Sequence, residues 1–162
     1  MTILAVFALA AAAMHTPGAA SATIFAPYLA GQNATPASER DIYTRPVRVL
    51  IARWMKLSTA IGEVDALNDF DWLCGCQDGD AKTYRAKIIS RRLIAPGLAE
   101  LRVLVRVTDR VPYIGRLRLR REGSRWLIED LFSADFKQGL QATLRSTIAE
   151  DAKVLKLRGS PQ

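Results

Sequence analysis

Two neighbouring stretches of this chain alternate between aliphatic and arginine-rich positions, and they constrain the fold more than any other feature. From Leu101 to Val107 the sequence reads LRVLVRV, and from Arg116 to Arg120 it reads RLRLR. A period of two residues is typical of a strand with one buried and one exposed face. The segment DRVPY between the two stretches is typical of a turn. The pattern therefore predicts an antiparallel hairpin with an apolar face and a basic face.

Flanking patterns predict further strands and helices. Strands are expected at residues 83–93 and 125–132, which brings the total to about four. A short helix is expected after Ala22, and an amphipathic helix is expected from Thr44, with Pro46 in its first turn, to about Leu67 with a bend near Gly62. A last helix is predicted from about Asp135 to Leu155. Its apolar stripe consists of Phe136, Leu140, Leu144, Ile148 and Ala152. This order predicts an α+β domain with helices packed on a curved antiparallel sheet.

The first residues resemble a secretory signal. An apolar run from Ile3 to Met14 precedes the small residues Ala20, Ser21 and Ala22, which predicts cleavage after Ala22. Residues 1–22 are thus expected to be a cleaved signal peptide, and residues 23–162 a single domain, secreted or periplasmic in a bacterium. The run is shorter than the roughly 20 residues that span a bilayer, so no transmembrane segment is expected after cleavage.

Histidine chemistry is excluded for the mature chain. The one histidine, His15, lies within the predicted signal peptide. Ser-His-Asp and Cys-His nucleophile systems and His-ligated zinc all need imidazole. No glycine-rich phosphate loop is present either. We therefore expect no cofactor and no metal, and any catalysis would rest on carboxylates, tyrosines, arginines or thiolates.

The segment DFDWLCGCQDGD, residues 69–80, holds both cysteines and four acidic residues, with no Lys or Arg. In an oxidising compartment Cys74 and Cys76 are candidates for a disulfide, because Gly75 permits the bend that so small a ring needs. Two thiols kept reduced by burial are the alternative, and a redox or metal role is a third. Asp69 and Asp71 are either paired acid-base groups or turn residues that accept hydrogen bonds from their own backbone.

The formal net charge of +7 favours anionic partners. If the aliphatic side chains of the predicted hairpin face the helices, a set of arginines faces outward. These residues are Arg102, Arg106, Arg116, Arg118 and Arg120. Such a face suits an acidic protein partner or an anionic envelope surface, and a homodimer is compatible with it. Nucleic acid is not expected because no aromatic residues are interleaved with the arginines. The alternative is a solvated face whose charges discourage edge pairing.

The order of elements, together with two short motifs, resembles a bacterial family of secreted and lipid-anchored proteins of unknown function. The matching residues are Phe70, Asp71, Leu73, Cys76, Gln77 and Asp78, then Trp126, Ile128 and Asp130, then Leu140 and Leu144. The resemblance covers roughly residues 24–150. It implies the cone-shaped nuclear-transport-factor-2-like fold, which often encloses a pocket between helix and sheet. The signal segment has no cysteine to acylate, unlike the lipid-anchored relatives.

Three functions remain open on these patterns. The first is a non-enzymatic binding or protein-interaction module, for example a protective partner of an envelope or toxin protein. The second is a small-molecule enzyme with a carboxylate base in the cone, where Asp71, Tyr84 or Asp130 would line the pocket. The third is a thiol redox protein that uses Cys74 and Cys76. Trp126 is expected in the core.

Overall fold

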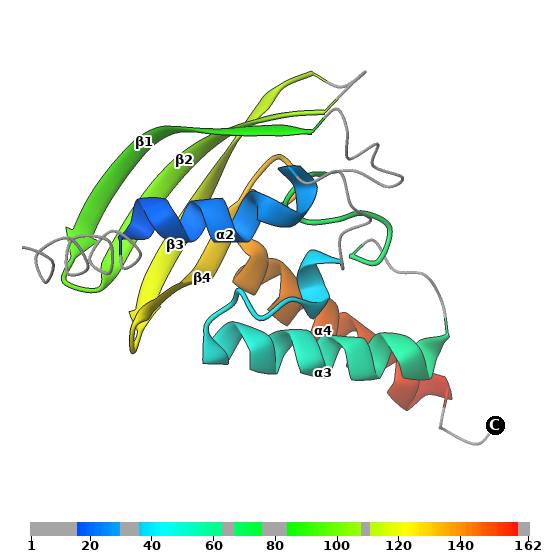
Figure 1. Ribbon diagram of the computed structural model, residues 1–162. Coiled ribbons are helices and arrows are strands. Elements are labelled where there is room, and N and C mark those ends of the chain that lie inside the picture. Colours follow the sequence, from blue (N-terminus) through cyan, green and yellow to red (C-terminus); the bar gives the residue numbers. More distant parts are fainter. Residues whose placement is uncertain (1–15, 30–35, 63–66, 76–83, 108–110, 159–162) are drawn as a thin grey trace, which may run out of the picture.

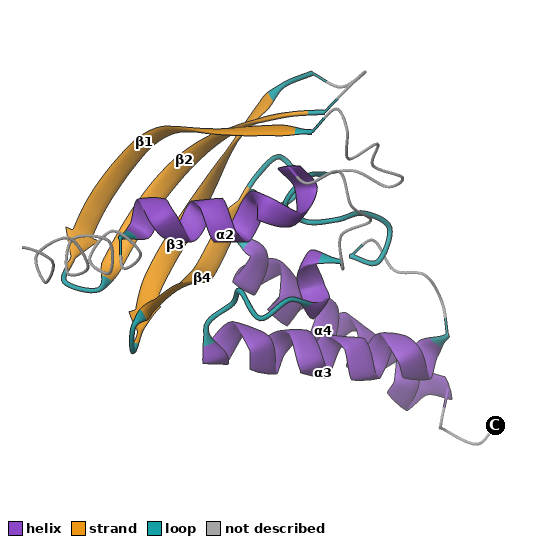
Figure 2. Ribbon diagram, in the orientation of Figure 1, coloured by secondary structure: helices purple, strands orange, loops and turns teal. Residues whose placement is uncertain are grey.

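The structure is a computed structural model that describes residues 16–29, 36–62, 67–75, 84–107 and 111–158. It is an α+β fold, as the sequence predicted, in which helices pack on one face of an antiparallel sheet (Figures 1 and 2). The helices are α2 (Pro17–Leu29), a short 3-10 helix (Ala37–Glu39), α3 (Arg45–Ile61) and α4 (Leu140–Arg158). The strands are β1 (Arg85–Ala95), β2 (Leu98–Arg106), β3 (Tyr113–Glu122) and β4 (Arg125–Phe132).

The sheet is a meander in the order β1-β2-β3-β4, with every neighbouring pair antiparallel. It arches over α2, while α3 and α4 pack against each other on the same side of the sheet (Figure 1). The predicted hairpin is therefore present as β2 and β3. The other face of the sheet is covered by none of these helices (Figure 2).

The aliphatic positions of the hairpin form the centre of the core. Leu101, Val103 and Val105 of β2 and Leu117 and Leu119 of β3 are all buried. Each faces the helices, because residues two apart on a strand share one face. The intervening arginines face outward, as the alternation predicted.

Helix α3 buries one stripe and ends earlier than predicted. Val47, Ile51 and Trp54 recur at helical spacing and are buried. The helix ends at Ile61 rather than near Leu67, because Gly62 follows in the left-handed conformation with φ +72°. Its amide donates to the carbonyl of Ser58 over 3.0 Å and so closes the last turn.

The last helix begins later than predicted, at Leu140 rather than near Asp135. The hydroxyl of Ser133 accepts hydrogen bonds from the amides of Asp135 and Phe136, which forms a turn in place of a first helical turn. Phe136 is buried but precedes the helix. Ala152, the last member of the predicted stripe, is exposed because this part of α4 extends past the core.

Three aromatic residues connect the acidic segment to the helical layer. The Trp72 ring lies 5.5 Å from that of Trp54 and 6.2 Å from that of Phe136, measured between centroids. Its indole N–H donates to the carbonyl of Leu67 over 2.9 Å, so this buried aromatic has a partner for its polar end. The segment is thus anchored in the core through its tryptophan.

Helix α2 runs across the predicted cleavage site between Ala22 and Thr23. After that bond, Ile24, Phe25 and Tyr28 are buried in the core. The residues that a mature chain would keep therefore include the apolar anchors of this helix. Within the described part of the chain, no helix combines the length and apolar character needed to cross a bilayer.

Candidate functional site

The Asp71 carboxylate is bound by donors from three segments. Oδ1 accepts hydrogen bonds from the Tyr28 hydroxyl at 2.8 Å and from the amides of Leu73 at 2.9 Å and Cys74 at 3.1 Å. Oδ2 accepts one from the amide of Ala37 at 2.9 Å. A carboxylate can accept about four hydrogen bonds, and Asp71 accepts four from the protein. Asp71 is thus the turn-forming aspartate that one interpretation predicted, and it also ties the turn to α2.

A cluster of buried tyrosines surrounds this carboxylate. The rings of Tyr28 and Tyr84 are 4.9 Å apart between centroids, and the guanidinium of Arg40 lies 5.4 Å from the Tyr28 ring centroid. Burial raises the pKa of Tyr28, Tyr43 and Tyr84 above the ordinary range, and the negative charge of Asp71 adds to that rise. We call Arg40, Asp71 and these three tyrosines the tyrosine cluster.

Three buried polar atoms of the tyrosine cluster have no hydrogen-bond partner within the described ranges. They are the hydroxyls of Tyr43 and Tyr84 and Nη1 of Arg40, whose Nη2 donates to the carbonyl of Ile24 at 2.5 Å. An unsatisfied buried polar group costs about 1–3 kcal/mol, and ordered water commonly satisfies such groups. These atoms mark a polar interior between α2, the segment before α3 and the start of β1.

The cysteine segment is only partly described. Cys74 is buried, with 1% of its surface exposed, whereas Cys76, Gln77 and Asp78 lie outside the described residues. The pairing of the two cysteines therefore stays a prediction. Gly75 has φ +64°, and its amide donates to the Asp71 carbonyl at 2.8 Å, which closes the turn. Thiol chemistry at Cys74 would need an access that its burial does not provide.

The structure brings Asp71 and Tyr84 together but places Asp130 elsewhere. The Oδ1 atom of Asp130 accepts hydrogen bonds from the amides of Leu131 at 3.0 Å and Gln141 at 3.1 Å. Gln141 is in the first turn of α4, so this carboxylate holds the start of that helix against β4, where the helix dipole favours negative charge.

The structure also shows the positions of Asp69 and Trp126, two further residues that the sequence suggested for the site. Asp69 is exposed, whereas Asp71 is half-buried, so the two carboxylates lie in different environments. Trp126, at the start of β4, is half-buried and packs against the core, close to the buried position that the sequence predicted.

Sequence reasoning missed Tyr28, Arg40 and Tyr43 as members of the tyrosine cluster. Tyr28 lies in the short helix after the predicted cleavage site, and the other two precede α3. No spacing or motif connects these residues to Asp71. The one available signal is that three of the four tyrosines of this chain occur before or just after the acidic segment, not in the regular strands that follow.

The outward arginines lie on the side of the sheet that the helices do not cover, and we call this set the basic outer face. Arg102 pairs across the strands with Arg116, and Arg118 pairs with Asp130. Residues directly opposite each other share a face, so the predicted arginines do lie together. The face consists of Arg102, Arg106, Arg116, Arg118 and Arg120.

Acidic and aromatic side chains occupy part of this face. Glu100 lies 3.6 Å from Arg92 and 3.7 Å from Arg116, and Glu129 pairs with Arg120. The Arg116 guanidinium also lies 4.0 Å from the ring centroid of Phe132. An aromatic residue is therefore interleaved with the arginines after all, contributed by β4 rather than by the hairpin, where sequence spacing does not reveal it.

Three cations on the outer side of β1 and β2 make no ion pair within the described residues. They are Lys87, Arg102 and Arg106, and we call these three residues the cationic end. Lys87 lies opposite Leu104, which lies opposite Ile114. Ile114 is 47% exposed. The cationic end thus surrounds an apolar strip, a composition that suits contact with an acidic protein surface.

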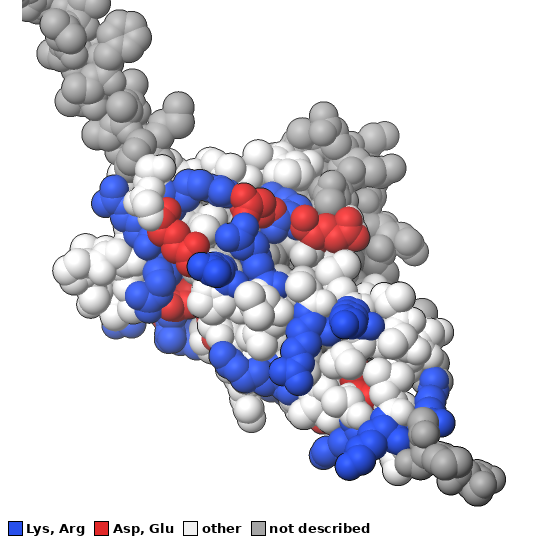
Figure 3. Space-filling model, turned by 90° about the horizontal axis from the view of Figure 1, so that it is seen from below, with Lys and Arg blue, Asp and Glu red and all other residues white. Residues whose placement is uncertain are grey.

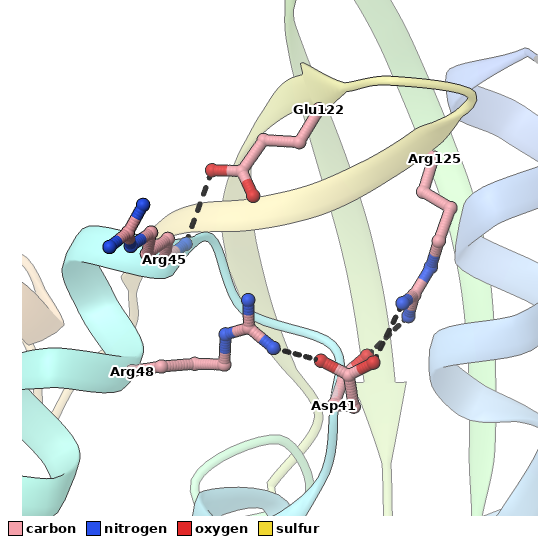
Figure 4. A network of polar contacts seen from close by, with 5 residues as sticks. All are labelled: Asp41, Arg45, Arg48, Glu122 and Arg125. Atoms are coloured by element: carbon pink, nitrogen blue, oxygen red, sulfur yellow. Dashed lines mark hydrogen bonds and ion pairs between the residues drawn. The ribbon is translucent and has the colours of Figure 1, made fainter.

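A separate polar network holds α3 against the sheet (Figure 4). Asp41 accepts a hydrogen bond from Arg48 at 2.6 Å and one from Arg125 at 2.7 Å, while Glu122 accepts from the amide of Arg45 at 3.1 Å. The Arg125 hydrogen bond is the main cause that lowers the pKa of Asp41. The side chains of Asp41, Arg48 and Arg125 are exposed but bind one another. We therefore interpret the network as a structural connection between α3 and the sheet.

Basic side chains are not confined to the sheet. Seen from below, Lys and Arg are spread widely over the surface, and Asp and Glu gather in smaller groups among them (Figure 3). A test of the basic outer face therefore needs a control that removes equal charge elsewhere.

No group of three or more His, Cys, Asp or Glu side chains converges as metal ligands would in the ranges that the structure describes. Comparisons with protein-family models, curated proteins and solved structures gave no match. The resemblance to nuclear-transport-factor-2-like proteins therefore stays a prediction.

Proposed function

We propose that this protein is a secreted, non-enzymatic binding module that recognises an acidic protein surface through its basic outer face. The observation that carries this proposal is the cationic end, where Lys87, Arg102 and Arg106 have no ion pair in the described ranges and lie around Leu104, next to the exposed side chain of Ile114. Charge on an open sheet face steers an anionic partner, and the apolar strip gives it area to bury. The proposal includes the nuclear-transport-factor-2-like cone, which the arch of the sheet over α2 supports.

The two carboxylates that the alternative enzyme hypothesis would use as a base both accept hydrogen bonds from the protein itself. Asp71 accepts four hydrogen bonds from the protein itself. Asp130 accepts two and holds the start of α4. A general base needs a lone pair within reach of the substrate proton. These contacts support the binding module over carboxylate catalysis.

The proposal is tested by measuring the affinity of the purified protein for poly-glutamate as salt is raised. Substituting Lys87, Arg102 and Arg106 by alanine should weaken binding about tenfold or more, since each rim charge contributes to association. The matched control replaces Arg53, Lys56 and Lys153, three exposed cations of α3 and α4, and so changes the net charge equally.

Equal loss in both triple variants would contradict the proposal, because binding would then follow net charge alone. The same measurement with vesicles that contain anionic lipid separates a protein partner from an envelope surface. Stronger binding to the vesicles than to poly-glutamate would also count against an acidic protein partner.

A further inference from the structure

The two edges of the sheet differ sharply. At the β4 edge, the amide of Thr44 donates to the carbonyl of Ile128 at 3.0 Å, and the amide of Ile128 donates to that of Ile42 at 2.8 Å. The side chain of Gln141 donates to the carbonyl of Glu129 at 2.7 Å. This edge is therefore covered. In the part of the chain that the structure describes, β1 pairs only with β2, so no described strand covers its other edge, which we call the open edge.

The open strand carries exposed apolar side chains. Leu93 is 65% exposed, Ile89 is 42% exposed and Ile94 is 41% exposed. Ile89 and Ile94 are the residues at which the pairing of β1 with β2 shifts register. Exposed edge strands with apolar side chains bind other strands unless something prevents it.

The charge of β1 opposes pairing with a second copy of this chain. The strand contains Arg85, Lys87, Arg91 and Arg92 and no acidic residue. Two copies of β1 placed side by side would bring the outer-face cations Arg85, Lys87 and Arg92 of one copy close to those of the other, and like charges on neighbouring strands are destabilising. The same charges would attract an acidic segment.

We propose that the open edge of β1 takes an extended acidic segment of the partner as an additional strand of the sheet. This inference rests on the proposed function and specifies the partner. Backbone hydrogen bonds to β1 supply affinity, as in other strand additions. Acidic side chains at alternate positions of the segment face Lys87 and compete with Glu100, 3.6 Å away, for Arg92 on the outer side of the sheet. Apolar side chains between them cover Leu93.

The probe is a short fluorescent peptide in which Glu alternates with Val, and its affinity is measured by anisotropy. A second peptide has the same side chains but N-methyl groups on alternate amides, which removes the hydrogen bonds along one edge. We expect N-methylation to weaken binding at least about tenfold, a change equivalent to 1.4 kcal/mol. Unweakened binding of the methylated peptide would overturn strand addition while leaving charge recognition by the basic outer face intact.

Charge variants locate the site. Lys87→Glu together with Arg92→Glu should reduce affinity for the unmethylated peptide about tenfold or more. Arg53→Glu with Lys56→Glu on α3 is the matched control and should change it far less. Failure of the intact protein to bind either peptide or poly-glutamate would overturn the proposed function as well as strand addition. Sedimentation of the free protein as a dimer to which the peptide does not bind would overturn the inference, because the peptide would then have no access to the edge.

Discussion

The hydroxyl of Tyr28 donates a hydrogen bond to Oδ1 of Asp71 over 2.8 Å, across 43 positions of the sequence. This bond joins α2 to the turn that contains Cys74. The turn itself depends on the same carboxylate, which accepts amide hydrogen bonds from Leu73 and Cys74. Helix and turn therefore share one acceptor group, and the loss of that group should affect both.

Removing this acceptor should destabilise the protein strongly. Asp71→Ala leaves the Tyr28 hydroxyl and three amides without their acceptor, and each unsatisfied buried donor costs about 1–3 kcal/mol. We expect a loss of at least about 3 kcal/mol in the free energy of unfolding measured with urea. Tyr28→Phe should cost only about 1 kcal/mol. Asp135→Asn, at an exposed position, is the control, and an Asp71→Ala loss no larger than that of the control would refute a central role for the carboxylate.

Alkaline pH should unfold the protein through its tyrosines. Burial first, and the Asp71 charge in addition, raise the folded pKa of Tyr28, Tyr43 and Tyr84 above the value of 10.0 expected in the unfolded chain. The folded state then holds protons that the unfolded state releases, so stability is complete below about pH 10 and falls as pH rises further. Absorbance of tyrosinate and circular dichroism should change together in a titration. Ionisation of all tyrosines before any loss of structure would contradict this coupling.

Substitution of Tyr43 by phenylalanine tests whether the polar interior holds water. If the hydroxyl is truly without a partner, Tyr43→Phe should leave the free energy of unfolding unchanged or raise it, since a desolvation cost is removed. If an ordered water binds it, the substitution should cost about 1 kcal/mol. We expect the second result because three orphan polar atoms belong to one cluster. Thermal unfolding of Tyr43→Phe, with Tyr84→Phe beside it, distinguishes the two.

Gly139 should tolerate no side chain. Its φ of +98° is strained for other residues, and a Cβ there would lie 2.7 Å from Oδ2 of Asp130. Gly123 also has a positive φ, +60°, but a Cβ there meets nothing within 4 Å. Gly139→Ala should therefore lower the free energy of unfolding by more than Gly123→Ala, which costs about 1 kcal/mol from backbone strain alone. Equal losses would show that contact with Asp130 is unimportant.

Export and cysteine oxidation can be checked by one intact-mass measurement. The protein recovered from the periplasm is alkylated in denaturant without reductant. A chain that begins at Thr23, lacks alkyl groups and is lighter by a pair of hydrogens is expected, because cleavage after Ala22 keeps Ile24, Phe25 and Tyr28 in the core. Alkylation of both cysteines on that mass would instead show thiols protected by burial. Recovery of a chain that still begins at Met1 would argue against a cleaved signal.

The strands were the most predictable part of the fold. The alternation in Leu101–Val107 and Arg116–Arg120 identified the hairpin and its two faces. Successive side chains of a strand point to opposite faces, so the aliphatic residues share one face and the arginines share the other. The ends of the helices were less predictable. Gly62 stopped α3 through its left-handed conformation, and Ser133 delayed α4 through a local turn. Both outcomes depend on short hydrogen bonds that compete with a continuing helix.

For the candidate sites, too, only the features that depend on a single segment could be predicted from the sequence. Outward placement of the arginines followed from their spacing along one strand. The neighbours that modify them, Phe132 beside Arg116 and Glu129 beside Arg120, come from β4 and depend on the register of β3 with β4. Register is set by the packing of one face against the helices and by turn geometry, and neither is visible in a single strand.

By itself, the sequence determined the α+β class, the strands and the basic outer face, because these follow from periodicities within single segments. Only the tertiary structure decided that Tyr28, Arg40 and Tyr43 surround Asp71 and that Asp130 serves α4 instead. It also decided which edge of the sheet has no partner strand among the described residues. These relationships join segments far apart in the chain, and burial of a shared core rather than any local preference brings them together.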